Sequence, residues 1–149
     1  MNEEYNKFME EAIREAKEGL KEGGIPIGSV LVKDGRIIGR GRNRRVQDKS
    51  AVLHAEIDCL ENAGRLTASE YAKCVLYSTL SPCEMCTGAI LLYKIPVIVV
   101  GENTTFTGPE AYASEKGLRI INLNMEECKY MMASFIKKNP DLWDEDIGQ

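Results

Sequence analysis

Apolar residues recur at helical spacing near both ends of the chain. In the first stretch they are separated by Glu, Lys and Arg, and they are Tyr5, Met9, Ala12, Ile13, Ala16 and Leu20. This pattern predicts an amphipathic helix that ends at Gly23-Gly24. The stretch from Met125 to Ile136 has the same spacing and predicts a last helix. Asn124 and Glu127 have the spacing of a capping box at its start, and Pro140 is expected to end it.

Short apolar runs between these helices predict strands. The runs are Ile27–Val32, Arg36–Gly41, Val75–Leu80, Val97–Val100 and Arg119–Leu123. Asp34-Gly35 is a hairpin signal between the first two. Further helices are expected over Ala55–Ala63, closed by Gly64, and from Pro82 to about Tyr93. A helix, a hairpin and then alternating strands and helices indicate a three-layer α/β/α sandwich.

Length and composition narrow the class of protein. The chain has 149 residues, of which 44% are hydrophobic and 28% charged, and this suits one globular domain over residues 1–149. It has no apolar stretch of membrane-spanning length and no signal-peptide pattern at its start, so we expect a cytoplasmic protein without a membrane partner. Five cysteines then indicate metal ligands and buried thiols more than disulfides. The net charge of −4 argues against nucleic acid as a partner.

The one histidine of the chain, His54, lies in a chemically specific spacing. It begins His54-Ala55-Glu56, and Pro82-Cys83-Glu84-Met85-Cys86 follows downstream. The pattern H-x-E…P-C-x-x-C is the signature of zinc-dependent nucleobase deaminases. His54, Cys83 and Cys86 offer the nitrogen and sulfur ligands that zinc prefers, and three protein ligands leave the open position of a catalytic site. We therefore predict a Zn²⁺ site.

Glu56 is the predicted catalytic residue. Two residues at about 100° each put it on the far side of a regular helix from His54. We infer that His54 sits at the helix start, where the chain bends, so that Glu56 approaches the reacting groups without ligating zinc. Two alternatives concern the cysteines. A structural zinc site would take Cys59, Cys74 or Cys128 as fourth ligand, and Cys83-x-x-Cys86 would otherwise be a redox pair. The unpaired, apolar settings of the three cysteines argue against the first, and the histidine argues against the second.

Stretches through nearly the whole chain resemble the fungal cytosine deaminases, within the wider cytidine deaminase-like superfamily. The stretches are Glu22–Gly28, Leu53–Glu56, Leu60–Leu66, Thr79–Ile90, Val99–Asn103 and the tail Trp143–Gly148. The zinc motif belongs to the whole superfamily. The acidic tail with its tryptophan is particular to the enzymes that act on the free base.

The resemblance implies a homodimer with a mixed five-stranded sheet and one zinc ion per subunit. It also implies a set of substrate contacts. Asn43 and the backbone of Ala55 would hold the carbonyl oxygen of the base, and Asp146 would accept the ring N–H that a nucleoside lacks. Four apolar residues would complete the pocket: Phe106 and Trp143 over the ring, and Ile27 and Leu80 along the wall. Ala55 and the loop around Phe106 depart from the fungal pattern, so the exact base preference stays open.

The predicted function is hydrolysis of a free pyrimidine base, most simply cytosine to uracil and ammonia, as in pyrimidine salvage. A guanine or other small-base deaminase is an alternative within the superfamily, and so is a tRNA adenosine deaminase. A tRNA adenosine deaminase would need a basic surface, and residues Arg36 to Arg45 form a basic run. Arginines that alternate on a hairpin are, however, typical of a solvated strand face. A silent zinc-binding interaction module is the alternative from another class. Glu56 argues against it, because a structural site needs no proton carrier.

Overall fold

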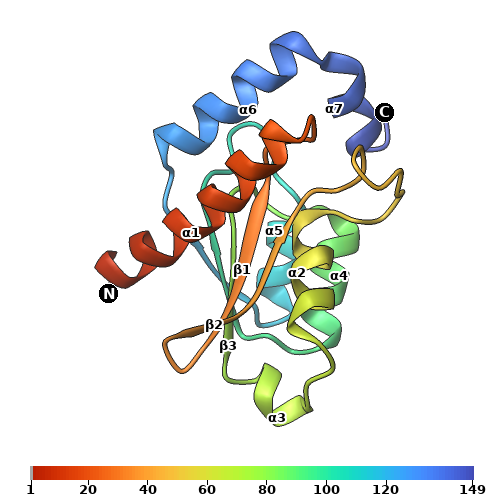
Figure 1. Ribbon diagram of the computed structural model, residues 1–149. Coiled ribbons are helices and arrows are strands. Elements are labelled where there is room, and N and C mark those ends of the chain that lie inside the picture. Colours follow the sequence, from red (N-terminus) through yellow and green to blue (C-terminus); the bar gives the residue numbers. More distant parts are fainter. Residues whose placement is uncertain (1) are drawn as a thin grey trace.

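A computed structural model describes residues 2–149 (Figure 1). The strands are β1 (Gly28–Lys33), β2 (Arg36–Arg42), β3 (Cys74–Ser78), β4 (Val97–Val100) and β5 (Arg119–Asn122). The helices are α1 (Asn2–Lys21), α2 (Ala55–Ala63), α3 (Ala68–Tyr71), α4 (Glu84–Leu92), α5 (Glu110–Glu115), α6 (Glu126–Lys138) and α7 (Pro140–Asp146). The strands form one sheet in the order β2-β1-β3-β4-β5. β1 pairs antiparallel with both β2 and β3, whereas β3, β4 and β5 are parallel. The predicted mixed five-stranded sheet is confirmed.

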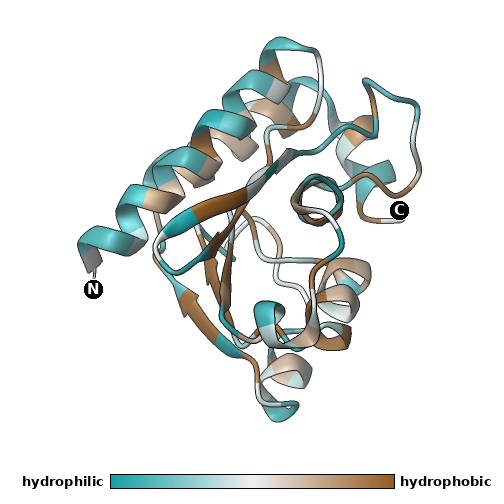
Figure 2. Cartoon of the chain, turned by 60° about the horizontal axis from the view of Figure 1, so that its bottom comes forward, coloured by the Kyte–Doolittle hydropathy of each residue, from teal (hydrophilic) through white to brown (hydrophobic). Residues whose placement is uncertain are grey.

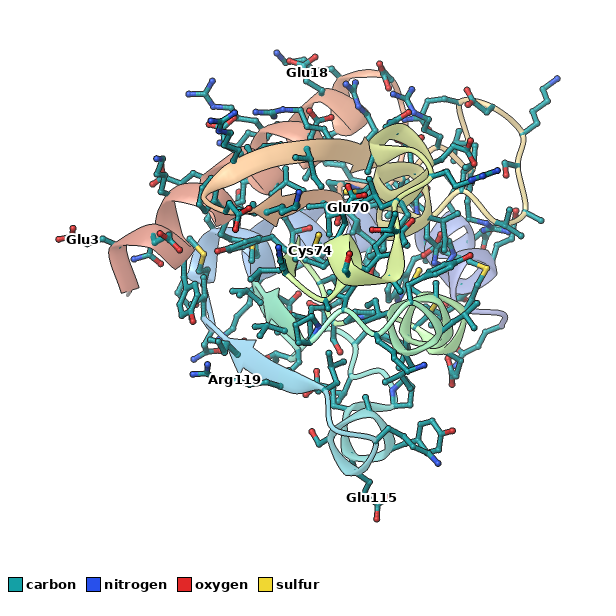
Figure 3. All side chains as sticks on the ribbon, turned by 90° about the horizontal axis from the view of Figure 1, so that it is seen from below. Glu3, Glu18, Glu70, Cys74, Glu115 and Arg119 are labelled. Atoms are coloured by element: carbon teal, nitrogen blue, oxygen red, sulfur yellow. The ribbon has the colours of Figure 1, made fainter. Side chains whose placement is uncertain are left out.

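Helices cover both faces of this sheet. α1 and α6 lie on one face, where Met9, Val30 and Met131 belong to one buried cluster (Figure 1). α2, α4 and α5 lie on the other, where Cys59 and Ile90 pack against the opposite side of the strands. Figure 2 shows apolar stretches along the strands and a hydrophilic outer face on α1, and in Figure 3 the side chains of Glu3 and Glu18 point away from the sheet. The expected α/β/α sandwich follows from this division.

Two glycines of β2 bring α2 unusually close to the sheet. A Cβ atom at Gly41 would lie 2.2 Å from the Cys59 nitrogen, and one at Gly39 would lie 2.8 Å from the Cys59 oxygen. Any larger residue would therefore push the backbone of α2 away from β2. This close approach matters for function, because the segment after β2 and the start of α2 both contribute to the pocket described below.

Several boundaries differ from those expected. α4 begins at Glu84, so Cys83 is its N-cap and Pro82 precedes it. The capping box predicted at Asn124 and Glu127 is wrong: Asn124 has φ of 52°, and Met125 is the N-cap of α6 without a side-chain hydrogen bond. Pro140 follows α6 as expected, yet it also occupies the first turn of α7, a position that needs no N–H. The pattern of apolar positions did not predict the short helices α3, α5 and α7.

The described residues include no helix that is both long and apolar enough to cross a membrane.

Candidate active site

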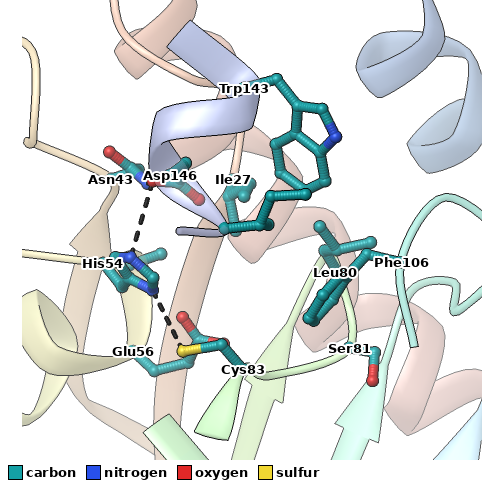
Figure 4. Close-up of a pocket in the computed structure, with 12 residues that line it drawn as sticks. Ile27, Asn43, His54, Glu56, Leu80, Ser81, Cys83, Phe106, Trp143 and Asp146 are labelled. Atoms are coloured by element: carbon teal, nitrogen blue, oxygen red, sulfur yellow. Dashed lines mark hydrogen bonds and ion pairs between the residues drawn. The ribbon is translucent and has the colours of Figure 1, made fainter. Parts of the chain in front are cut away.

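A cavity lies at one end of the sheet, where several chain segments leave or enter it. β2 and β3 run in the same direction and β1 runs opposite to both. Ile27 before β1, Asn43 after β2 and Leu80 after β3 therefore meet at the same end. The cavity is lined by Ile27, Asn43, His54, Ala55, Glu56, Leu80, Ser81, Cys83, Phe106, Trp143, Asp146 and Ile147 (Figure 4). This is the carboxyl end of the parallel strands, where α/β folds place their ligands.

Three atoms that can ligate a metal ion lie together at this cavity, one each from His54, Cys83 and Cys86, and we call these three residues the donor cluster. His54 Nδ1 lies 3.4 Å from Cys83 Sγ and 3.7 Å from Cys86 Sγ. His54 is the extended N-cap of α2, as its inferred place at the helix start requires, and Cys83 is the extended N-cap of α4. The hydrogen bond with Cys86, together with that with His54, lowers the pKa of Cys83 to about 4. Cys83 is thus available as the thiolate that binds a metal ion.

The chemistry of this donor set fits zinc. The ligand atoms of His54, Cys83 and Cys86 all lie within 4.8 Å of one another, and no fourth His, Cys, Asp or Glu among residues 2–149 joins the group. Cys59, Cys74 and Cys128 belong to the apolar clusters on the two faces of the sheet. Burial raises the pKa of Cys59 and of Cys128 to about 12, so both are neutral thiols. One nitrogen and two sulfurs, without a fourth ligand of these types in the part of the chain that the structure describes, correspond to a catalytic zinc site.

Glu56 lies two residues after His54, in the first turn of α2, and its buried side chain lines the cavity. Ser78 Oγ, at the end of β3, donates to Glu56 Oε2 at 3.2 Å. Burial raises the pKa of Glu56 to about 7, although the nearby charge of His54 opposes this change. A carboxyl group with such a pKa can both accept and donate a proton near neutrality.

A second polar pair lies across the cavity from Glu56. Asn43 Nδ2 donates to Asp146 Oδ1 at 2.9 Å, and Asn43 Oδ1 accepts from the backbone N–H of Arg45 at 3.0 Å. Asp146 Oδ1 also lies 3.6 Å from His54 Nε2 and 3.7 Å from Arg45 Nη1. Burial raises the pKa of Asp146, and the charge of His54, the hydrogen bond from Asn43 and the charge of Arg45 oppose this. Figure 4 shows Asn43 and Asp146 side by side above His54.

Apolar side chains form the remaining wall. The rings of Phe106 and Trp143 meet edge to face, with centroids 6.2 Å apart and planes at 85°. Ile27 and Leu80 pack with them in one cluster. A flat aromatic ring is the ligand shape that such a narrow, partly aromatic site accommodates.

The structure brings together all the residues that were predicted to bind zinc or substrate or to transfer protons. Ten of them line the cavity, and Cys86 belongs to the donor group beside it. Ser81 and Ile147 also line it and were missed. Ser81 Oγ donates to Glu110 Oε2 at 2.6 Å and accepts from the Gly108 N–H at 3.0 Å, so it ties down the loop that carries Phe106. Ile147 stands four positions after Trp143, a spacing that would have indicated a shared helix face.

The basic run after Asp34 is largely neutralised within the protein. Its arginines pair with carboxylates of α1, α2 and the segment after α1: Arg40 with Glu11 and Glu15, Arg42 with Glu15 and Glu22, and Arg44 with Asp58. The shortest of these contacts is 2.6 Å, between Arg40 Nη2 and Glu11 Oε1. The run is therefore a brace between the hairpin and its neighbouring helices rather than a free cationic surface.

Comparisons with known proteins agree with the site. The model of the cytidine and deoxycytidylate deaminase zinc-binding region matches residues 2–102. A cytosine deaminase of Candida albicans is 50% identical over 144 residues, which are 96% of this chain and 96% of that protein. A tRNA-specific adenosine deaminase of Streptococcus pyogenes is 41% identical over 111 residues, 73% of this chain and 70% of its own length.

A solved structure has a similar fold. It comes from a study of A-to-I editing by tRNA:A34 deaminases at the wobble position and superposes with a TM-score of 0.71 at 29% identity. The superposition covers 85% of this chain and 99% of the other. The similarity to the Candida protein, in contrast to the Streptococcus protein, extends over almost the entire chain.

Proposed function

The chain belongs to the cytidine and deoxycytidylate deaminase zinc-binding family, and we propose that it converts free cytosine to uracil and ammonia. Membership rests on the family match over residues 2–102 and on the 50% identity to a cytosine deaminase. The enzyme is then a zinc-dependent aminohydrolase. We propose a free base as the substrate because of the position of Asp146. We assign the proton transfers of the reaction to Glu56.

The position of Asp146 is the observation that favours a free base over a nucleoside as the substrate. Among residues 2–149, the polar contacts of this carboxylate all use Oδ1, to Asn43, Arg45 and His54. Oδ2 is left to accept a hydrogen bond from a ligand. In free cytosine the ring nitrogen N1 carries a hydrogen, whereas in a nucleoside that nitrogen carries the sugar. A buried carboxylate at this place therefore favours the base and opposes the nucleoside.

The remaining contacts orient the ring. Asn43 Nδ2 has two hydrogens, one of which Asp146 accepts, so the other can be donated to the carbonyl oxygen of the base. The N–H of Ala55, in the first turn of α2, is a second donor for the same oxygen. Phe106 and Trp143 cover the ring, and Ile27 and Leu80 line its edge. These contacts direct the amino-bearing carbon toward Glu56 and the donor cluster.

Proton transfer is assigned to Glu56. Zinc held by His54, Cys83 and Cys86 would acidify water and so supply a hydroxide nucleophile near neutral pH. Glu56 accepts a proton from water and delivers it to the ring nitrogen next to C4 as the hydroxide adds to C4. It then takes the remaining proton of the new C4 hydroxyl group and passes it to the amino group, so that ammonia leaves and the C4 carbonyl of uracil forms. Its pKa of about 7 suits both directions of transfer. Ser78 holds the carboxyl group in place between these steps.

A substrate panel tests the proposal. Ammonia release is measured with cytosine, cytidine, guanine, adenine and tRNA as substrates of the zinc-loaded protein. We expect turnover of cytosine and none of cytidine. Turnover of cytidine but not cytosine would contradict the role of Asp146, and turnover of guanine or of tRNA would establish one of the alternative deaminases. The internal pairing of Arg40, Arg42 and Arg44 already weakens the case for tRNA.

We also propose that the enzyme is a homodimer. Apolar side chains stand exposed on α4 and at its C-cap, with Met85 37%, Leu92 67% and Tyr93 43% accessible. Two adjoining hollows, one toward α2 and α3 and one toward α5, share Leu92 in their lining. An apolar surface of this kind is typical of a protein interface, and a second copy is the occupant that the fungal enzymes suggest. Light scattering coupled to gel filtration should give twice the mass of 16.6 kDa, and Leu92→Glu should reduce it.

The cellular role we propose is pyrimidine salvage in the cytoplasm. The cysteines are all free thiols, which suits a reducing compartment. Deamination of cytosine yields uracil, a base that can re-enter nucleotide synthesis. Fluorescence of a tagged copy in the source cell and growth on cytosine as the only pyrimidine source test these two statements.

A further inference from the structure

Asp58 is a buried carboxylate that the mechanism above does not use. It lies on α2, 5% exposed, one turn after His54, and its N–H donates to the His54 carbonyl oxygen at 2.9 Å. Its Oδ2 accepts two hydrogen bonds, from the backbone N–H of Arg42 and from Arg44 Nε, both at 3.0 Å. These two donors belong to the residues on either side of Asn43. One carboxylate oxygen therefore holds both neighbours of a substrate-contacting side chain.

Backbone hydrogen bonds also hold the segment around Asn43 in place. Its N–H donates to the Ile27 carbonyl oxygen at 3.0 Å, and the N–H of Arg44 donates to the Leu53 carbonyl oxygen at 2.8 Å. Leu53 is the residue before His54. The segment after β2 is thus attached to the residue before β1 on one side and to the start of α2 on the other. Asp58 provides its side-chain attachment to α2.

Burial makes this attachment strong and its loss costly. The side chain of Asp58 is 7% exposed and that of Arg44 is 28% exposed. A charge-assisted hydrogen bond in such a setting is roughly twice as strong as a neutral one. Without the carboxylate, the Arg42 N–H and the Arg44 guanidinium would both lose their partner, and the segment that carries Asn43 would be free to move relative to α2.

We propose that Asp58 is a positioning residue that sets where Asn43, and through it Asp146, stands relative to Glu56 and the donor cluster. His54, Glu56 and Asp58 belong to the same end of α2, whereas Asn43 and Asp146 come from other elements. Asp58 joins these two halves of the site without touching the substrate. This inference rests on the proposed function for its kinetic consequence, but its structural content does not.

The test compares Asp58→Ala, Asp58→Asn, Arg44→Ala and the double variant Asp58→Ala/Arg44→Ala in the zinc-loaded protein. Glu11→Gln is the matched control, because it removes an ion pair with Arg40 of the same hairpin, away from Asn43. Zinc content, the melting temperature, KM and kcat for cytosine, and the NMR resonances of the Asn43 side-chain amide are measured for each. Asn43→Asp identifies those resonances by their disappearance.

We expect Asp58→Ala to raise KM about tenfold with kcat changed by less than about threefold, one zinc still bound, and the Asn43 resonances shifted. Asp58→Asn keeps one acceptor oxygen and should recover part of the loss. The double variant should be no worse than Asp58→Ala, since both changes break the same contact. Glu11→Gln should change neither KM nor the Asn43 resonances.

Two outcomes would overturn the inference. A lower melting temperature with unchanged KM and unmoved Asn43 resonances would make Asp58 a purely structural residue. Loss of zinc from Asp58→Ala would mean that it supports His54 rather than Asn43. If the unaltered protein releases no ammonia from cytosine, the proposed function is wrong, and the Asn43 resonances still decide whether Asp58 positions that side chain.

Discussion

The side-chain amide of Asn43 donates a hydrogen bond to the carboxylate of Asp146 at 2.9 Å, across 103 positions of the sequence. Asn43 follows β2, and Asp146 ends α7 at the far end of the chain. The bond closes the cavity on the side opposite Glu56 and fixes which oxygen of Asp146 remains for a ligand. It makes the last turn of α7 part of the site.

Removal of the Asp146 carboxylate should therefore abolish recognition of the free base. For Asp146→Ala we expect kcat/KM for cytosine to fall by ~10²–10⁴-fold, because the ring N–H would lose its buried acceptor. Asp144→Ala is the control, since this exposed residue lies on the same short helix. Ammonia release is the measurement. An equal loss in both variants would mean that the substitutions only loosen α7.

Glu56→Gln should separate chemistry from metal binding. The amide keeps the shape of the side chain but cannot carry a proton between the nucleophile, the ring and the leaving amine. We expect kcat to fall by ~10²–10⁴-fold with zinc content unchanged. Single-turnover ammonia release and metal analysis check this. Turnover at the rate of the unaltered protein would disprove the assigned role.

The metal site should depend on Cys86 and be indifferent to Cys128. Cys86→Ala removes one of the three donors, so we expect zinc content well below one per chain and no activity. Cys128→Ala alters a thiol in the core cluster under α1 and should leave zinc at one per chain. Dialysis against a chelator should abolish ammonia release and lower the melting temperature, and added zinc should restore both. Loss of zinc from the Cys128 variant would indicate a closed, four-ligand site.

Phe106 should matter more for substrate binding than for folding. It is half-buried, and its edge-to-face contact with Trp143 contributes ~0.5–1.5 kcal/mol beyond burial. We expect Phe106→Ala to raise KM for cytosine by roughly fivefold to tenfold, with a loss of about 1–2 kcal/mol in unfolding free energy. Tyr130→Ala, on the outer face of α6 and 74% exposed, is the control and should change neither quantity. Urea denaturation and initial rates give both numbers.

The pair between Glu11 and Arg40 should give a pH-dependent share of stability. The hydrogen bond from Arg40 lowers the pKa of Glu11 below its ordinary value. Its contribution is therefore present above the unfolded pKa of ~4.3 and is lost as the pH falls through the lower folded value. Because both side chains are partly exposed, Glu11→Gln should cost ~0.2–1 kcal/mol at pH 7 and almost nothing at pH 2–3. Urea denaturation at both pH values tests the sign, and a larger cost at low pH would contradict it.

The periodicity of apolar residues along the sequence predicted the helices and strands that bury a continuous apolar face. Ala55–Ala63 and Val97–Val100 have the expected bounds, because an apolar stripe or run marks each of them directly. α5 and α7 were missed because short helices that present few buried residues have no clear period. The capping box at Asn124 failed for a different reason: two residue types at the right spacing do not determine φ, and Asn124 adopts a left-handed conformation in the turn before α6.

The sequence by itself determined the chemistry of this protein. His54, Glu56, Cys83 and Cys86 could be predicted from their spacing, because each pair stands at the start of one helix, and the packing of α2 beside α4 then brings the two pairs together. Only the tertiary structure decided what those groups face. The Asn43–Asp146 bond, the Asp58 brace and the pairing of the arginines of β2 join elements that no local rule relates. The first two exist because the sheet order brings the end of β2, the start of α2 and the C-terminal helix to one end of the molecule, where buried polar groups must find partners. The arginine pairs exist because α1 packs beside β2.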